Sequence, residues 1–192
     1  YALGEGAGVV VLQRLDDALS QGRPIWSTIC GSAVNQDGRS AGLTAPRESA
    51  QVEVIRRALE AAQLMPDRID TVEAHGTGTS LGDSTELRAL GEVFSRSQTA
   101  VLPIGSSKAN FGHLESAAGM LGLFKVLACQ YYGQLVPHRL FGPLSQAVEW
   151  ETAGLCLPAH VVPWRARQQM RTAGISAFGF SGTNAHLIVV QD

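Results

Sequence analysis

The segment VEAHGTGTSLGDSTE, residues 72–86, constrains the fold of this chain more than any other. It starts as a short apolar strand that ends in Glu73 and Ala74, with His75 at the carboxyl end of the strand. Asp83 and Glu86 have the spacing of a capping box, which predicts that a helix begins here. Because α/β proteins gather their chemistry beyond the carboxyl ends of strands, the segment predicts an α/β fold with His75 in a functional loop.

The turn after His75 alternates glycine with threonine. Gly76 and Gly78 allow the backbone to turn sharply and to approach a ligand closely. Thr77 and Thr79 add two hydroxyl groups on the same short arc. The turn is therefore a candidate binding loop, and a plain glycine-rich turn beside a solvated histidine is the alternative interpretation.

A second strand, predicted over residues 100–105, leads into another polar turn that contains Lys108 and His113. A helix is predicted from Leu114 to Tyr132, and its patch of small residues favours a central, buried position. His113 precedes the N-terminus of this helix, where the dipole disfavours imidazolium, so we expect a neutral His113. A lone lysine is usually solvated, but Lys108 is a site candidate because it lies five residues before His113.

Two further strands, over residues 172–177 and 184–190, flank the turn FGFSGT. This turn places Phe180 between glycines and beside free backbone N–H groups, which suits either an oxyanion-binding turn with a hydrophobic gate or a tight hairpin. Three loops thus carry polar groups at strand ends, which indicates one shared site. We expect no metal there, because neither His75 nor His113 has the close-spaced partner of a zinc motif.

The rest of the chain is predicted to support this site. We expect a strand at residues 9–12, a short polar helix or turn at 16–22, a strand at 23–34, a helix at 48–63, and a surface connection at 133–171 with short extended pieces at 155–157 and 161–164. Cys30 lies within the strand at 23–34, where a cysteine is usually a small buried residue. The polar loop at 35–46 is long enough to be functional.

Composition narrows the class of function. Hydrophobic residues make up 45% of the chain, which is ample for a core, and a net charge of −2 leaves no basic field for nucleic acid or an anionic membrane. No apolar run approaches the length of a bilayer span. The three cysteines are widely spaced and match no metal-binding pattern, so we expect a reducing, cytoplasmic setting.

Three motifs in series, EAHGTGTSLGD, SSKANFGHLESAAG and GISAFGFSGTNAH, resemble the C-terminal half of a β-ketoacyl synthase of the thiolase-like superfamily. The loop VNQDGRSAGLTAP and the opening GEGAGVVVL are similar to the ketosynthase domains of modular type I polyketide synthases. The resemblance covers essentially the whole chain. It implies an α/β fold with a mixed sheet layered with helices, which is one half of an αβαβα architecture when complete.

The resemblance also implies a reaction, the decarboxylative Claisen condensation of a cysteine-bound acyl thioester with a malonyl-type extender. By match to the family motifs, His75 and His113 donate hydrogen bonds to the oxygen that becomes the enolate, and Lys108 fixes His113. The implied site is completed by Thr77 and Thr79 on the phosphopantetheine arm, by the backbone N–H of Phe180 in the oxyanion hole, and by Glu115 and Asn184 in support. No cofactor is bound directly, since phosphopantetheine arrives on an acyl carrier protein.

The nucleophilic cysteine of this family lies in a TACSSS-like motif of the N-terminal half, and no such motif occurs in these 192 residues. We therefore expect residues 1–22 to be the last strand and connection of the N-terminal half, and residues 23–192 to be the C-terminal half. The implied partners are the other half, an acyl carrier protein and a second copy within a multidomain synthase.

Two other functions are weighed against this one. A catalytically silent ketosynthase-like scaffold or chain-length-factor subunit is disfavoured because His75, Lys108 and His113 are all retained. A thiolase-type enzyme that acts on coenzyme A esters fits less well with a histidine pair and a lysine.

Overall fold

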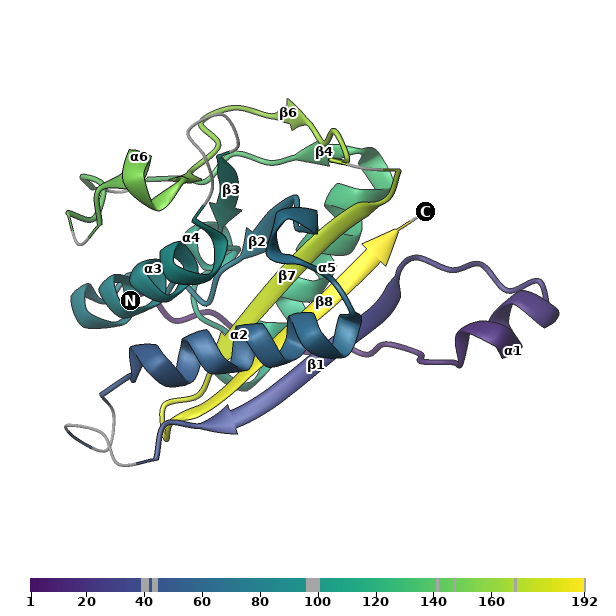
Figure 1. Cartoon of the computed structure of the whole chain (residues 1–192), viewed down its shortest axis with the longest axis horizontal. Coiled ribbons are helices and arrows are strands. Elements are labelled where there is room, and N and C mark those ends of the chain that lie inside the picture. The colour runs from purple at the N-terminus through teal and green to yellow at the C-terminus, as the bar shows by residue number, and fades with distance from the viewer. Residues whose placement is uncertain are drawn as a thin grey trace.

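The computed structural model describes residues 1–38, 42, 45–95, 101–140, 142–146, 148–167 and 169–191. A six-stranded mixed sheet forms the middle of the molecule, and helices cover it (Figure 1). The elements are α1 (Leu15–Ser20), β1 (Thr28–Gln36), α2 (Glu48–Ala62), η1 (Pro66–Arg68), β2 (Thr71–Glu73), α3 (Ser80–Phe94), β3 (Leu102–Gly105), α4 (Lys108–Phe111), η2 (Glu115–Ala117), α5 (Ala118–Tyr132), β4 (Gln134–Leu135), α6 (Trp150–Ala153), β5 (Leu155–Cys156), β6 (Val162–Pro163), β7 (Arg171–Phe178) and β8 (Thr183–Gln191).

The strand order in the sheet is β1-β8-β7-β2-β3-β5. The first three strands pair antiparallel, whereas β7, β2, β3 and β5 pair parallel. The carboxyl ends of β2, β3 and β7 therefore meet at one edge of the sheet, and the three loops singled out from the sequence start there. This arrangement confirms the predicted α/β class with a mixed sheet.

The core is split by the sheet into two clusters. Successive residues of a strand point to opposite faces, and on β8 Ile188 belongs to the cluster under α2 and α3 while Val189 belongs to the cluster under α5. Helix α2 packs very closely on β1, since a Cβ atom at Gly31 would lie 2.4 Å from the carbonyl oxygen of Ala58. The result is a helix–sheet–helix sandwich, consistent with one half of a layered fold.

Helix α3 begins four residues earlier than the spacing of its carboxylates predicts, so the capping-box interpretation of Asp83 and Glu86 is wrong. Ser80 is the first helical residue, and Thr79 occupies the N-cap position. From inside the helix, Asp83 accepts the backbone N–H of Gly78 (3.0 Å), and Glu86 accepts N–H groups of the same loop. The two carboxylates therefore brace the preceding turn rather than cap the helix.

Two predictions for the N-terminal part are also wrong. Residues 9–12 form no strand, because no neighbouring strand in the described part of the chain pairs with them, and Val9 and Val11 are 86% and 94% exposed. The strand predicted at 23–34 starts only at Thr28, and Cys30 within it is exposed rather than buried. Cys30 lies at a bulge in β1. Among the described residues β1 is the edge strand of the sheet and pairs only with β8.

The connection at 133–171 contains both of the short extended pieces expected in it, β5 and β6. Buried Asp70 ties this connection to the start of β2, because its carboxylate accepts the indole N–H of Trp164 and the backbone N–H groups of Arg167 and Thr172. Of the polar loop at 35–46, residues 39–41, 43 and 44 lie outside the described residues. None of the helices described here is long and apolar enough to cross a membrane.

Candidate active site

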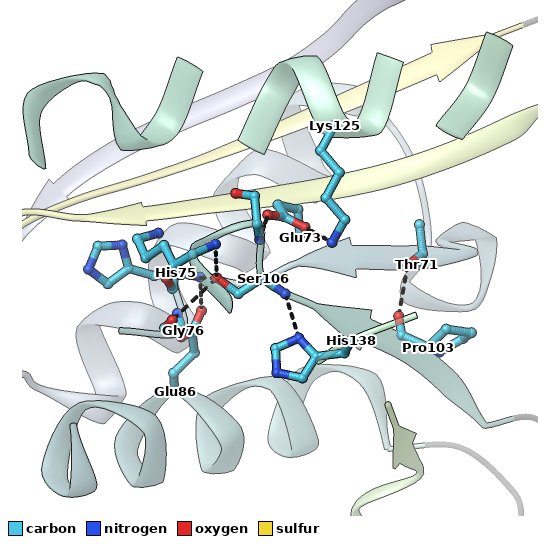
Figure 2. Close-up of polar contacts among 11 residues, drawn as sticks. Thr71, Glu73, His75, Gly76, Glu86, Pro103, Ser106, Lys125 and His138 are labelled. Carbon is cyan, nitrogen blue, oxygen red and sulfur yellow. Dashed lines mark hydrogen bonds and ion pairs between the residues drawn. The ribbon is translucent and has the colours of Figure 1, made fainter. Parts of the chain in front are cut away.

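The loop that carries His75 is held from inside helix α3. Glu86, which is 3% exposed, accepts the backbone N–H of His75 with one carboxylate oxygen (2.7 Å) and that of Gly76 with the other (2.8 Å) (Figure 2). Gly76 has a φ of +46°, and a Cβ atom there would lie 2.8 Å from the Ser106 side chain, so the turn requires glycine. These contacts fix the backbone from which the His75 imidazole projects.

Burial sets the charge of the carboxylates behind this loop. Desolvation raises the pKa of Glu86 to about 7, against the lowering effect of its two backbone hydrogen bonds and of Lys108. Desolvation also raises the pKa of Asp83. Both carboxyl groups behind His75 are therefore harder to ionise than a solvent-exposed carboxyl group.

The second histidine is clamped by the N-terminal segment of the chain. The backbone N–H of His113 donates to the carbonyl of Ala2 (2.8 Å), and its carbonyl accepts the N–H of Gly4 (3.0 Å). The backbone N–H of Glu115, a residue with a φ of +49°, donates to Nδ1 of His113 (2.8 Å). Because Nδ1 is an acceptor, the ring proton of neutral His113 lies on Nε2.

The two imidazoles meet edge to face, with centroids 5.5 Å apart and an interplanar angle of 84°. Burial, then the charge of Lys108, then the second histidine lower the pKa of His75 to about 3. Burial and Lys108 also lower the pKa of His113. Both rings are therefore neutral at neutral pH. The sequence predicts a neutral His113 from the helix dipole, but the main cause of its lowered pKa is burial. His113 is also separated from the start of α5 by η2.

Lys108 is the first residue of α4, a short helix where the sequence predicts a turn. Burial lowers its pKa, and the nearby carboxylates of Glu86, Glu73 and Asp83 act in the opposite direction. Lys108 does not line the cavity described below, and its charge lowers the pKa of both histidines.

The backbone of Lys108 is joined to the His75 loop through Ser106. The Lys108 N–H donates to the Ser106 hydroxyl oxygen (3.4 Å), and this hydroxyl donates to the carbonyl of Gly76 (3.2 Å) (Figure 2). One serine thus links the loop after β2 with the loop after β3.

An open cavity of about 950 Å³ lies in front of the histidine pair. The predicted site residues that line it are His75, Thr77, Thr79, His113, Glu115 and Phe180. The hydroxyl oxygens of Thr77 and Thr79 lie 3.1 Å apart, and Phe180 is 81% exposed. The described residues contain no group of three or more side chains placed to hold a metal ion.

Asn184 lies away from the cavity, buried at the base of the Phe180 turn. Its amide donates to Oδ1 of Asp37 (2.7 Å) and to Oδ1 of Asn35 (3.2 Å). Asp37 in turn donates its backbone N–H to the carbonyl of Gly182 (2.8 Å). The polar loop after β1 therefore holds the turn that carries Phe180.

Sequence reasoning missed three polar residues behind the site: Glu73 and Ser106, which are buried, and Lys125, which is partly buried. Glu73 was hidden as the last residue of an apolar strand, and Lys125 lies within the apolar run GLFKVLAC. Charged residues are rarely buried unless they are paired. A carboxylate at the end of a buried strand and a lysine within an apolar helical run are therefore a signal of an ion pair. The buried, central position predicted for this helix is wrong, because α5 buries only one side and Tyr131 and Tyr132 are exposed.

The sequence matches the family of the beta-ketoacyl synthase C-terminal domain over residues 26–141. It is 46% identical over its full length to a phenolphthiocerol/phthiocerol polyketide synthase of Mycobacterium tuberculosis, of which it covers 10%. It is 47% identical, again over its full length, to erythronolide synthase EryA3 of Saccharopolyspora erythraea, of which it covers 6%. The chain thus spans a tenth or less of the length of these curated relatives.

Solved structures share the fold. The ketosynthase from module 6 of the bacillaene synthase of Bacillus subtilis 168 superposes with a TM-score of 0.89 at 39% identity, over 94% of this chain and 33% of that one. The oxazolomycin ketosynthase domain OzmH KS7 of Streptomyces albus JA3453 gives a TM-score of 0.88 at 38% identity, over 94% and 33%. This chain therefore belongs to the β-ketoacyl synthase C-terminal domain family, in the form found in the ketosynthase regions of modular polyketide synthases.

Proposed function

We propose that this chain supplies the extender-activating half of a polyketide ketosynthase site, which catalyses decarboxylative Claisen condensation. The observation that carries the proposal is the pair of neutral imidazoles, His75 and His113, which meet at an open cavity beyond the ends of the strands. A neutral imidazole donates one hydrogen bond without bringing a full charge. Such a pair suits a reaction in which negative charge appears during the step rather than before it.

Decarboxylation of a malonyl thioester creates that charge. Loss of CO₂ breaks a C–C bond and moves its electron pair towards the thioester oxygen, which becomes an enolate oxygen. Fixed N–H donors in a pocket poor in water stabilise this charge. Nε2–H of His113 is such a donor, because Nδ1 is occupied by the N–H of Glu115, and His75 supplies the second. The enolate carbon then attacks the acyl thioester, and the cysteine thiolate leaves.

Lys108 maintains the histidines in the form that this step requires. Its positive charge contributes to the low pKa of His75 and of His113. The same charge lies behind the oxygen that becomes negative, so it favours the transition state as well. In this sense Lys108 fixes His113 by charge, without lining the cavity.

The cavity mouth is assigned to the phosphopantetheine arm of an acyl carrier protein. Thr77 and Thr79 place adjacent hydroxyls on its wall, and Phe180 is an exposed aromatic ring at its rim. The backbone N–H of Phe180 is assigned to the oxyanion hole of the acyl-enzyme, with Asn184 holding its turn. The nucleophilic cysteine belongs to the other half of the ketosynthase, within a homodimeric, cytoplasmic synthase.

A His75→Ala variant of the complete synthase tests this function. We expect decarboxylation of a malonyl-loaded carrier protein to fall by about 100-fold or more, the usual cost of losing an oxyanion donor, while acylation of the cysteine continues. Intact-mass spectrometry follows both steps. His160→Ala, at an exposed position outside the cavity, is the matched control.

Two results would contradict the proposal. Full condensation by His75→Ala would remove the histidine pair from the mechanism. A wild-type synthase with a complete companion half that never decarboxylates the malonyl donor would favour a silent scaffold instead.

A further inference from the structure

Glu73 ends strand β2 directly behind the histidine loop, and both of its carboxylate oxygens are engaged (Figure 2). Oε1 accepts the backbone N–H of Ser107 (2.6 Å), and Oε2 pairs with Nζ of Lys125 (2.5 Å). The Glu73 side chain is 4% exposed and that of Lys125 22%, so the carboxylate is buried and the lysine is partly buried. One carboxylate thus connects α5 to the residue that precedes α4.

Two glycines make the space for this pair. A Cβ atom at Gly105 would lie 3.0 Å from Nζ of Lys125, and a Cβ atom at Gly122 would lie 3.1 Å from Cγ of Glu73. A Cβ atom at either glycine would therefore force the neighbouring side-chain atom to move by a few tenths of an ångström. The pair is built into the packing between the sheet and α5.

The hydrogen bond from the Ser107 N–H to Glu73 is relevant to the site because Ser107 directly precedes Lys108. The neighbouring Ser106 donates its N–H to Nδ1 of His138 (3.2 Å) and its hydroxyl to the carbonyl of Gly76 (3.2 Å). The backbone at 106–108 is therefore held by a carboxylate, by an imidazole and by the histidine loop. Of these three supports, only the carboxylate carries a charge opposite to that of Lys108.

We propose that Glu73 and Lys125 are a positioning pair for the decarboxylating step. Lys125 holds the Glu73 carboxylate, the carboxylate holds the Ser107 N–H, and this contact sets Lys108 behind the two histidines. The inference rests on the function proposed above. Lys108 and Lys125 are the only lysines in the sequence. In this arrangement the charge of Lys108 acts on the histidines, and Lys125 holds the carboxylate that positions Lys108.

The charge balance agrees with this geometry. The Glu73 carboxylate raises the pKa of Lys108, and Lys125 lowers it. Loss of Lys125 would leave a buried carboxylate without its counter-charge, which is strongly unfavourable, whereas removal of both charges leaves a neutral side chain that still accepts the Ser107 N–H. Replacement of Lys125 alone is therefore expected to reduce decarboxylation more than replacement of both Glu73 and Lys125.

The experiment compares Lys125→Met, Lys125→Arg and the double variant Glu73→Gln/Lys125→Met in the complete synthase. We expect the decarboxylation rate of Lys125→Met to fall by about 100-fold, which is the cost of a displacement of about 1 Å at a reacting group. Acylation of the cysteine should change little. Lys125→Arg and the double variant should recover most of the decarboxylation. Arg56→Met, which removes the cation of the exposed Arg56–Glu92 ion pair, is the matched control.

The outcomes separate the two proposals. Wild-type decarboxylation is measured first, and its absence contradicts the proposed function. If the wild type is active, two results overturn the positioning pair. One is an unchanged decarboxylation rate in Lys125→Met. The other is a loss of decarboxylation and acylation that follows the folded fraction measured by circular dichroism. If Lys125→Met does not fold, the double variant decides, because a folded double variant without decarboxylation also overturns the pair.

Discussion

The tautomer of His113 is the sharpest residue-scale feature of the site. A side-chain amide can replace only one ring nitrogen: glutamine reaches the Nε2 position, whereas asparagine reaches the Nδ1 position. Because Nδ1 accepts the Glu115 N–H, we expect His113→Asn to lose about 100-fold or more in decarboxylation and His113→Gln to retain clearly more. Rates of CO₂ release from a malonyl-loaded carrier protein measure this. Equal losses would show that Nε2–H is not the donor.

A second residue, His186, makes the stability of the fold sensitive to acid. It is fully buried on β8, with Nδ1 3.0 Å from the Ser176 hydroxyl, and burial lowers its pKa to about 3. Free histidine titrates near pH 6.5, so between pH 6.5 and 3 the unfolded chain binds a proton that the folded chain does not. The free energy of unfolding therefore falls by about 1.4 kcal/mol per pH unit below 6.5 on account of this residue.

Replacement of His186 tests this linkage. Between pH 7 and pH 5, we expect the free energy of unfolding of His186→Gln to fall by about 2 kcal/mol less than that of the wild type. Urea unfolding of the ketosynthase region measures this. Exposed His160→Gln should keep the wild-type slope. Glu86 acts in the opposite direction, because its raised pKa lets the folded state take up a proton between about pH 7 and 4.5, but this contribution is the same in every variant. An unchanged slope in His186→Gln would refute the assignment.

At the scale of elements, the close packing of α2 on β1 sets how the first helix layer sits on the sheet. A Cβ atom at Gly31 would collide with the backbone of α2 at Ala58 and Ala62. Gly31→Ala should therefore destabilise the domain by about 2 kcal/mol, which lowers the thermal midpoint by about 4–8 °C. Gly142→Ala, at an exposed glycine with nothing within 4 Å, should not change it. Differential scanning calorimetry measures both, and equal midpoints would show that α2 can move aside.

The elements show what local sequence can and cannot predict. Periodicity and turn residues predict α2, β2, β3 and the β7–β8 hairpin closely, because these patterns are local. The start of α3 is mispredicted because carboxylates at capping-box spacing can serve the helix or the loop before it, and only the tertiary fold decides which. The burial of Cys30 depends on which strand lies at the sheet edge. Glu73 and Lys125 are 52 residues apart, and no local pattern links them.

At the scale of the whole molecule, apolar side chains remain uncovered, among them Val9, Val11 and Leu12 of the N-terminal segment. Folded domains rarely leave large apolar patches exposed without a partner. The chain covers only a third of the solved ketosynthase to which it is compared, 33%. We infer that another part of the synthase covers residues 9–12, which form no strand in this chain.

Hydrogen exchange can show this pairing directly. We expect amides of residues 9–12 to exchange fast in the isolated 192-residue chain and slowly in the complete synthase, because a ladder of backbone hydrogen bonds forms only there. Amides of β7 and β8, which are paired along their length in the chain itself, should be protected in both samples and serve as the internal control. Fast exchange at residues 9–12 in the complete synthase would contradict the assignment of this segment to the N-terminal half. Slow exchange there would show that another part of the synthase pairs with the N-terminal segment, which also holds the backbone of His113 through Ala2 and Gly4. Assembly of the synthase and placement of the histidine would then depend on one stretch of chain.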